Sequence, residues 1–212
     1  MSLTYVISDL HGRLDLLNVA LDKILMNAPG TVVFTGDYID RGPDSAGVVQ
    51  RIMDGPKDGW RWVPIRGNHE DMMLECVRGT ADLGWWVGNG GAATLASYGG
   101  EPFAAHLDWC DALPRLWSDE HRVYVHAGMS KQYDMAEQPE EITQWYRYPT
   151  GADVGYRGKH VVHGHTPNRN GPELFSQRTN LDTYAVGTGR LVVGVFDDNK
   201  PGGPVSLIEV KA

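Results

Sequence analysis

Cysteine, net positive charge and long apolar runs are all scarce in this chain of 212 residues. Its two cysteines, Cys76 and Cys110, form no C-x-x-C pair, which excludes a structural zinc site built on thiolates and argues against a disulfide framework. The formal net charge is −8 with both signs interspersed, so we expect no general nucleic-acid-binding surface. No stretch approaches the ~20 apolar residues of a membrane-spanning helix, and the first five residues lack the character of a secretory signal. These absences predict a cytoplasmic protein with no membrane partner.

The residues that are present predict a sizeable core, because apolar side chains make up 42% of the chain. Strand-like and helical runs alternate in the first half, a mainly helical stretch follows at 81–113, and strands dominate the second half. The β-α-β-α-β order implies parallel strands joined by right-handed crossovers. We therefore expect one α/β domain of the α+β type over residues 1–212, with two sheets packed face to face and helices outside. The expected strands are 4–8, 31–35, 60–65, 122–125, 160–163, 179–181, 191–196 and 205–210, and the expected helices are 14–26, 46–53 and 71–77.

Five of the expected strands end at residues that are able to bind a metal ion. In α/β sheets, ligands gather beyond the carboxyl ends of the strands, so these residues can meet at one edge. Each residue alone has a plainer interpretation, since Asp after a strand is usually a turn former or helix cap and a lone His is usually a hydrogen-bonded core residue. Five coincidences, nearly all preceded or followed by a glycine that lets backbones approach closely, favour a shared site. The residues are Asp9 and His11, Asp37, Asn68 and His69, His126, and His163 and His165.

The ligand types indicate which metals the site would take. Carboxylate, amide and imidazole donors without sulfur suit manganese, iron or zinc. One carboxylate can bridge two ions, and ions ~3.5–4 Å apart form the two-metal arrangement used in phosphoryl chemistry. We therefore expect two divalent metal ions, manganese first, with iron or zinc as alternatives.

Five short motifs contain nearly all of these strand-end residues. They are Asp-Leu-His-Gly at 9–12, Gly-Asp-Tyr-Ile-Asp-Arg-Gly at 36–42, Gly-Asn-His-Glu at 67–70, His-Ala-Gly at 126–128 and Gly-His-Thr at 164–166. Together they resemble the signature of calcineurin-like metallophosphoesterases. More narrowly, they are similar to the phosphoprotein phosphatase branch, which includes bacterial and phage serine/threonine phosphatases and diadenosine tetraphosphatase. The resemblance implies a β-sandwich of two mixed sheets flanked by helices, in four layers.

The resemblance also implies a role for each polar residue. His69 would be the general acid, with Asp40 orienting its ring, and histidine does titrate in the range useful for proton transfer. Arg41 and Arg147 would bind phosphate oxygens, which planar guanidinium groups do bidentately. Six residues are implied as metal ligands: Asp9 and His11 on the first ion, Asn68, His126 and His165 on the second, and Asp37 bridging both.

The leading functional prediction is metal-dependent hydrolysis of phosphomonoesters by solvent activated at a dinuclear metal centre. A phosphorylated protein bearing phosphoserine or phosphothreonine is the first expected substrate, and a small phosphoester the second. The alternative is a nucleotide pyrophosphohydrolase similar to diadenosine tetraphosphatase, or a phosphodiesterase. The short insertion at 129–148 slightly disfavours that alternative, whereas Tyr184 would narrow the cleft or stack on a base. No particular oligomeric state is predicted.

Several other features carry plainer interpretations. The glycine-rich segment 88–94 lacks the Walker lysine and follows no expected strand, so we interpret it as a helix break near the cleft. Glu70 either supports the neighbouring candidate ligands or is an acid favoured in the first turn of a helix, and we favour the second interpretation. Trp85, Trp86 and Trp109 are expected in the core. Among the remaining histidines, His163 is expected beside the ligands without binding metal, and His106, His121 and His160 are assigned no function.

Overall fold

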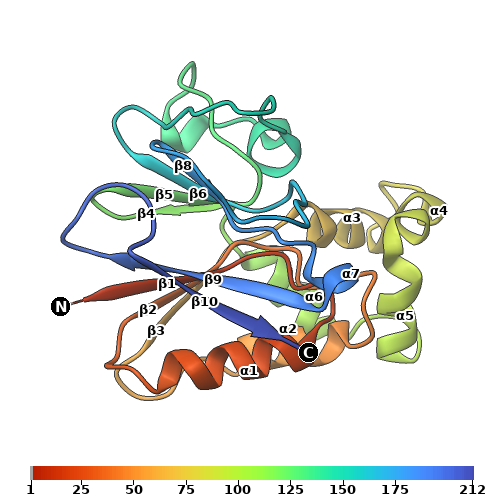
Figure 1. Cartoon of the computed structure of the whole chain (residues 1–212). Helices are drawn as coiled ribbons and strands as arrows, with labels where there is room; N and C mark the ends of the chain where they lie inside the picture. The colour runs from red at the N-terminus through yellow and green to blue at the C-terminus, as the bar shows by residue number, and fades with distance from the viewer. Residues whose placement is uncertain (1) are drawn as a thin grey trace.

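Two five-stranded mixed sheets form the centre of the computed structural model, which describes residues 2–212 (Figure 1). The first sheet has the order β10-β9-β1-β2-β3 and the second β4-β5-β6-β8-β7. In the first sheet β1, β2 and β3 are parallel, and β9 is antiparallel to both of its neighbours. In the second, β5, β6 and β8 are parallel, with antiparallel strands at both edges. The bounds are β1 Leu3–Ile7, β2 Thr31–Phe34, β3 Arg61–Pro64, β4 Leu116–Ser118, β5 Arg122–Val125, β6 His160–His163, β7 Glu173–Leu174, β8 Arg178–Asn180, β9 Arg190–Asp197 and β10 Ser206–Lys211.

Helices cover the outer face of the first sheet and extend beyond one end of its strands (Figure 1). The outer face of the second sheet is covered mainly by irregular chain that contains two short helical turns. The helices are α1 Leu14–Leu25, α2 Ser45–Met53, α3 Asn68–Val77, α4 Leu83–Trp86, α5 Ala92–Tyr98, α6 Ala104–Ala112 and α7 Ala185–Thr188. The other turns are η1 Val87–Gly91 and η3 Glu141–Trp145, which are π-helical, and η2 Met135–Glu137, which is 3₁₀.

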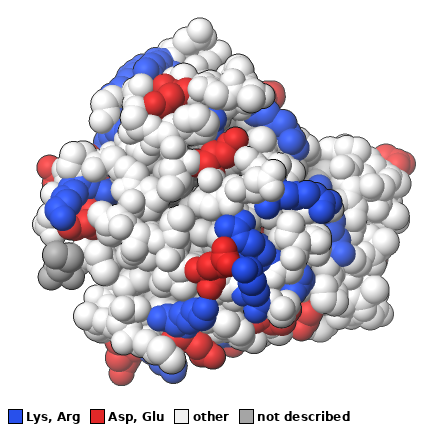
Figure 2. Space-filling view, viewed as in Figure 1, with Lys and Arg blue, Asp and Glu red and all other residues white. Residues whose placement is uncertain are grey.

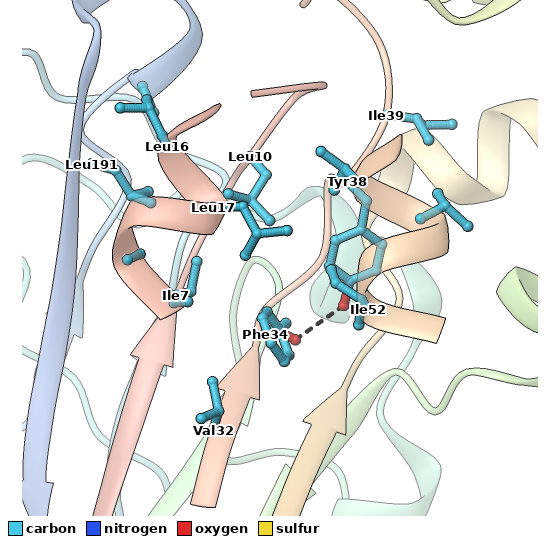
Figure 3. Packing of buried hydrophobic residues seen from close by; sticks show 14 of the residues in the cluster. Ile7, Leu10, Leu16, Leu17, Val32, Phe34, Tyr38, Ile39, Ile52 and Leu191 are labelled. Carbon is cyan, nitrogen blue, oxygen red and sulfur yellow. Dashed lines mark hydrogen bonds between the residues drawn. The ribbon is translucent and has the colours of Figure 1, made fainter. Parts of the chain in front are cut away.

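Alternation along the strands divides the core between the two faces of the first sheet. Tyr5 and Ile7 of β1 belong to the cluster packed under the helices, whereas Val6 between them belongs to the cluster that joins the two sheets. Figure 3 shows Ile7 and Phe34 packed against α1 and the loop after β2. In that loop the Tyr38 hydroxyl donates to the carbonyl of Phe34 at 3.2 Å and to that of Ile65 at 2.5 Å. These core contacts of Tyr38 thus fix the loop after β2, on which part of the site is built.

The expected architecture is confirmed. All eight expected strands and all three expected helices are present, with small differences at their ends. The helical region 81–113 is broken at η1, as expected of the glycine-rich segment. Strands β4 and β7 were not expected, because runs of three and two residues are too short to show a period.

Two surface properties bear on the expected partners. On the face shown in Figure 2, Lys and Arg side chains are interspersed with Asp and Glu rather than gathered into a continuous basic surface. Some of these charges are paired, as Arg190 is with Glu209 at 2.7 Å. Within residues 2–212, no helix has both the length and the apolar character needed to cross a membrane.

Candidate metal centre

The carboxyl ends of six parallel strands, three from each sheet, supply the residues of one site. The site opens into a cavity of about 290 Å³. Because strands from both sheets contribute, the site joins the two halves of the fold. The strands and the residues that follow them are β1 with Asp9 and His11, β2 with Asp37, β3 with Asn68 and His69, β5 with His126, β6 with His165, and β8 with Asp182.

Four electron-pair donors converge at one point of the site. His126 Nε2 lies 2.8 Å from Asn68 Oδ1, 3.1 Å from His165 Nδ1 and 3.4 Å from Asp37 Oδ1. His165 Nδ1 is in turn 3.1 Å from Asn68 Oδ1. Each of these residues is buried. Such donors repel one another unless something positive lies between them, so this donor set fits a divalent cation.

A second group of possible ligands shares Asp37. His11 Nε2 lies 3.6 Å from Asp37 Oδ2, and His69 Nε2 lies 3.8 Å from the same oxygen. Both carboxylate oxygens of Asp37 therefore face histidine nitrogens, one oxygen in each group. Asp9 also lines the cavity, and its carboxylate accepts the backbone N–H of His165 at 3.0 Å.

Hydrogen bonds on the far side of two rings fix which nitrogen faces the site. The carbonyl of Ile39 lies 2.8 Å from His11 Nδ1, and the carbonyl of Thr35 lies 2.8 Å from His126 Nδ1. A carbonyl only accepts, so Nδ1 carries the proton in each ring and Nε2 keeps its lone pair. Metal-binding histidines commonly have this arrangement, because the outer hydrogen bond orients the ring.

Burial sets the charge state of the site. Burial raises the pKa of Asp37 well above its usual range, and the carboxylate of Asp9 raises it further. Burial also lowers the pKa of His126 to about 3 and that of His165 to about 2. The histidines are therefore neutral donors, while crowded carboxylates favour a positive partner, and both properties suit metal binding.

Backbone strain is concentrated at the site. Seven non-glycine residues between 2 and 212 have positive φ, and six of them lie at or beside the cavity. Such conformations cost of order 1–3 kcal/mol each and persist where surrounding contacts impose them. The six are His11 (43°), Asp37 (55°), Asp40 (73°), Arg41 (68°), His165 (64°) and Tyr184 (57°).

Two glycines allow the backbone to approach the carboxylates. A Cβ added at Gly164 would lie 1.9 Å from Asp9 Oδ2, and one added at Gly67 would lie 2.3 Å from Asp37 Oδ1. Neither distance is compatible with a side chain. Any larger residue at these positions would displace a candidate ligand.

A histidine–aspartate pair lies next to the candidate ligands. His69 Nδ1 is 2.6 Å from Asp40 Oδ2, and both side chains are buried. Burial raises the pKa of Asp40 to about 7, although hydrogen bonds from Thr94 and Trp86 oppose the rise. Burial, followed by the positive charge of Arg41, lowers the pKa of His69. The two groups are thus positioned to share one proton.

A model of calcineurin-like phosphoesterases matches residues 3–194. The chain belongs to this family. It is therefore a hydrolase that acts on phosphate esters.

Named relatives of this phosphoesterase include two kinds of enzyme. Serine/threonine-protein phosphatase 1 of Salmonella typhimurium is 27% identical over 206 residues, which cover 89% of each chain. The symmetrical bis(5'-nucleosyl)-tetraphosphatase of Neisseria meningitidis is 32% identical over 166 residues, which cover 74% of this chain and 52% of the relative. This chain thus spans about half the length of that tetraphosphatase.

Solved structures resemble the phosphoesterase over its whole length. A candidate diadenosine tetraphosphatase superposes with a TM-score of 0.75 at 23% identity, covering 100% of this chain and 94% of the other. A cold-active protein tyrosine phosphatase superposes with a TM-score of 0.67 at 17% identity, covering 99% and 76%. Identities this low support the fold alone.

The phosphoesterase brings the predicted site residues together. The cavity is lined by Arg41 and Arg147 as well as by most of the candidate ligands. Arg41 Nη1 donates to His11 Nε2 at 2.6 Å, which places its guanidinium beside the donor groups. His126 lies behind the lining residues and reaches the site through Asn68 and His165.

Three interpretations from the sequence need correction. Glu70 is more than a favourable charge in a first helical turn: its buried carboxylate accepts the backbone N–H groups of Asp37 at 3.0 Å and Tyr38 at 2.8 Å. Trp85 is 40% exposed and stacks on Trp145 rather than lying in the core, because α4 projects beyond the sheet. His163 was expected beside the candidate ligands, but its Nε2 lies 3.1 Å from Arg178 Nη1. It lines a different cavity from the one that the candidate ligands line.

Sequence reasoning missed three residues of the site. Asp182 follows β8 and lines the cavity, and burial raises its pKa to about 6. The strand-end rule that found the other ligands also applies to Asp182, so the signal was present. Trp86 and Thr94 contact Asp40 across 46 and 54 residues, and no local pattern predicts such contacts.

Proposed function

We propose that this phosphoesterase hydrolyses phosphomonoesters, above all phosphoserine and phosphothreonine in proteins. The observation that carries the proposal is a cluster of donor groups beside the His69–Asp40 pair. Donor atoms of Asn68, His126 and His165 lie 2.8–3.1 Å from one another, and Asp37 Oδ1 lies 3.4 Å from His126 Nε2. A donor cluster next to a possible proton donor, in a cavity bearing arginines, suits transfer of a phosphoryl group to solvent.

In this proposal two divalent metal ions occupy the site, with manganese as the first candidate and iron or zinc as alternatives. When bound, the ions supply positive charge that lowers the pKa of a solvent nucleophile and neutralises the phosphate. Asp9 and His11 would hold one ion, Asp37 would be shared by both ions, and the other ion would have three ligands of its own. These three are Asn68, His126 and His165.

The protein's own groups handle the phosphate and the leaving oxygen. Arg41 and Arg147 bind the phosphate oxygens from the cavity wall. The Nδ1–H of His69 donates a hydrogen bond to the Asp40 carboxylate, so Nε2 is left to face the reacting ester. A bound phosphate dianion and the Asp40 carboxylate both favour the protonated ring. As the bond from phosphorus to the leaving oxygen breaks, His69 Nε2 donates its proton to that oxygen.

The choice of substrate rests on the extent of the similarity. The match to the Salmonella phosphatase covers 89% of both chains, whereas the match to the Neisseria tetraphosphatase covers 52% of that relative. The tetraphosphatase is nevertheless the basis of a second candidate function, hydrolysis of a dinucleoside tetraphosphate. We further propose that residues 1–212 act as one domain in the cytoplasm.

A substrate panel tests the proposal. The purified protein, supplied with Mn²⁺, is assayed against a phosphothreonine peptide, 4-nitrophenyl phosphate and diadenosine tetraphosphate. We expect kcat/KM to be highest for the phosphopeptide and turnover to stop when the metal is chelated. If diadenosine tetraphosphate were turned over faster than the phosphopeptide by orders of magnitude, the proposed substrate class would be overturned. Full turnover after chelation would overturn the metal requirement.

A further inference from the structure

Three residues at intervals of four, Trp86, Gly90 and Thr94, all contact the Asp40–Arg41 pair from the segment α4–η1–α5. We infer that they form a clamp that positions Asp40 and, through it, the proton-donating His69. Trp86 and Thr94 are thus positioning residues rather than groups that touch substrate. The inference rests on the proposed role of His69.

The clamp and His69 together surround the carboxylate of Asp40. Oδ1 accepts from Thr94 Oγ1 at 2.6 Å and from Trp86 Nε1 at 3.0 Å. Oδ2 accepts from Trp86 Nε1 at 2.9 Å and faces His69 Nδ1 at 2.6 Å. Each carboxylate oxygen has two lone-pair positions, so the contacts occupy all four. The carboxylate therefore has one preferred orientation, which is the orientation that holds His69.

The third member of the clamp acts through the backbone. The carbonyl of Gly90 accepts the N–H of Arg41 at 3.1 Å. A Cβ at Gly90 would lie 2.6 Å from Arg41 Cγ, and φ at Gly90 is 116°, so a side chain there is disfavoured twice. Asp40 and Arg41 both have positive φ, at 73° and 68°. Gly90 thus supports a backbone that would otherwise relax.

Packing alone does not explain these contacts. A threonine inside a helix commonly bonds back to a carbonyl of its own helix. Within residues 2–212 the Thr94 hydroxyl bonds instead to Asp40 and Ser45, which lie in the loop and helix after β2. Trp86 is buried in the core, and its N–H reaches both oxygens of Asp40. The polar atoms are aimed at one carboxylate.

The dependence of the rate on the leaving group distinguishes misplacement of the proton donor His69 from a general loss of active-site structure. A proton donor matters most when the leaving oxygen is strongly basic, as in phenyl phosphate, and least when it is weakly basic, as in 4-nitrophenyl phosphate. In Thr94→Val the shape is kept and the hydroxyl lost. We expect kcat for phenyl phosphate to fall by about tenfold, the effect of one hydrogen bond to a charged group, with KM little changed. The fall for 4-nitrophenyl phosphate should be smaller.

Matched variants complete the experiment. Thr94→Ser keeps the hydroxyl and should restore most of the rate, whereas Trp86→Phe lacks the N–H and should repeat the leaving-group pattern. Ser97→Ala, on the same helix but hydrogen-bonded to Ala46 rather than to Asp40, should behave as the wild type. Trp86→Phe also provides the test if Thr94→Val does not fold.

The reference is His69→Asn, measured with the same two esters. Suppose that His69→Asn loses more kcat for phenyl phosphate than for 4-nitrophenyl phosphate, and that neither clamp variant shows this difference. The clamp is then refuted, while the role of His69 stands. Equal losses for both esters in the clamp variants would also refute it. If His69→Asn has no leaving-group dependence, the proposed proton donor fails, and the clamp fails with it.

Discussion

At Gly164 the absence of a side chain decides where Asp9 lies. An alanine Cβ would come within 1.9 Å of Asp9 Oδ2, and Asp9 is itself held by the N–H of His165. We predict that Gly164→Ala displaces Asp9 and lowers kcat at least tenfold, because misplacing such a group by even 1 Å is costly. The measurement is kcat for 4-nitrophenyl phosphate over a range of Mn²⁺ concentrations.

Gly88→Ala is the matched control, because no atom lies within 4 Å of a Cβ added at Gly88. It should retain wild-type kcat. Equal activity in both variants would show that Asp9 is not confined by Gly164.

At the scale of single residues, the sequence predicted which candidate ligands come together better than it predicted the residues that support them. Asp9, Asp37 and His126 were recognisable because each follows an apolar strand and lies near a glycine. The supporting role of Glu70 was the less favoured interpretation, because its partners are backbone N–H groups of Asp37 and Tyr38, brought close only when β2 and β3 pair. Hydrogen bonds between distant segments leave no periodic trace in the sequence.

Elements were predictable where they are long enough to show a period. Helix α1 buries residues at helical spacing, and β1 alternates between two clusters. Strand β4 shows no period over three residues. The kink at Gly90, where φ is 116°, interrupts the helical segment 83–98, and composition alone does not predict how the turns on either side of it are oriented. The role of 86–94 therefore became visible only in the packing of this segment against the loop after β2.

Strand β6 carries a histidine with a consequence for acid stability. His160 is buried, and its Nε2 lies 2.9 Å from Thr179 Oγ1 on β8. Burial lowers its pKa from 6.5 to about 4. Between these values the unfolded chain binds more protons than the folded protein, so stability rises with pH. The contribution is fully present above pH 6.5 and is lost as the pH falls through about 4.

We predict that the wild type is more stable than His160→Gln at pH 7.5 and that this advantage shrinks toward pH 5. Free energies of unfolding from urea titrations of both proteins provide the measurement. An advantage that stays constant between the two pH values would contradict the assignment of a neutral, buried His160.

For the whole molecule, one candidate metal centre built from both sheets implies that the halves fold together. The cluster between the sheets contains Val6 and Val33 from the first sheet, Val162 from the second, and Leu181 just after β8. We predict one cooperative urea transition, coincident by circular dichroism and tryptophan fluorescence. Leu181→Ala should lower the free energy of unfolding by about 2–5 kcal/mol, as expected for a fully buried leucine.

Leu174→Ala provides the control, because Leu174 on the edge strand β7 is 52% exposed. Its effect should stay within about 0.5 kcal/mol. Two separated transitions, or equal effects of the two substitutions, would argue that the sheets are independent units.

The central claim is that Asp37 bridges two metal ions at the strand ends. Elemental analysis tests this claim directly on protein reconstituted with Mn²⁺ and passed through a desalting column. We predict about two ions per chain in the wild type, the number in a dinuclear hydrolase, and clearly fewer in Asp37→Asn. Asp22→Asn, at an exposed position on α1, should match the wild type. A wild type that binds no metal, or an Asp37→Asn variant with an unchanged metal content, would contradict the account.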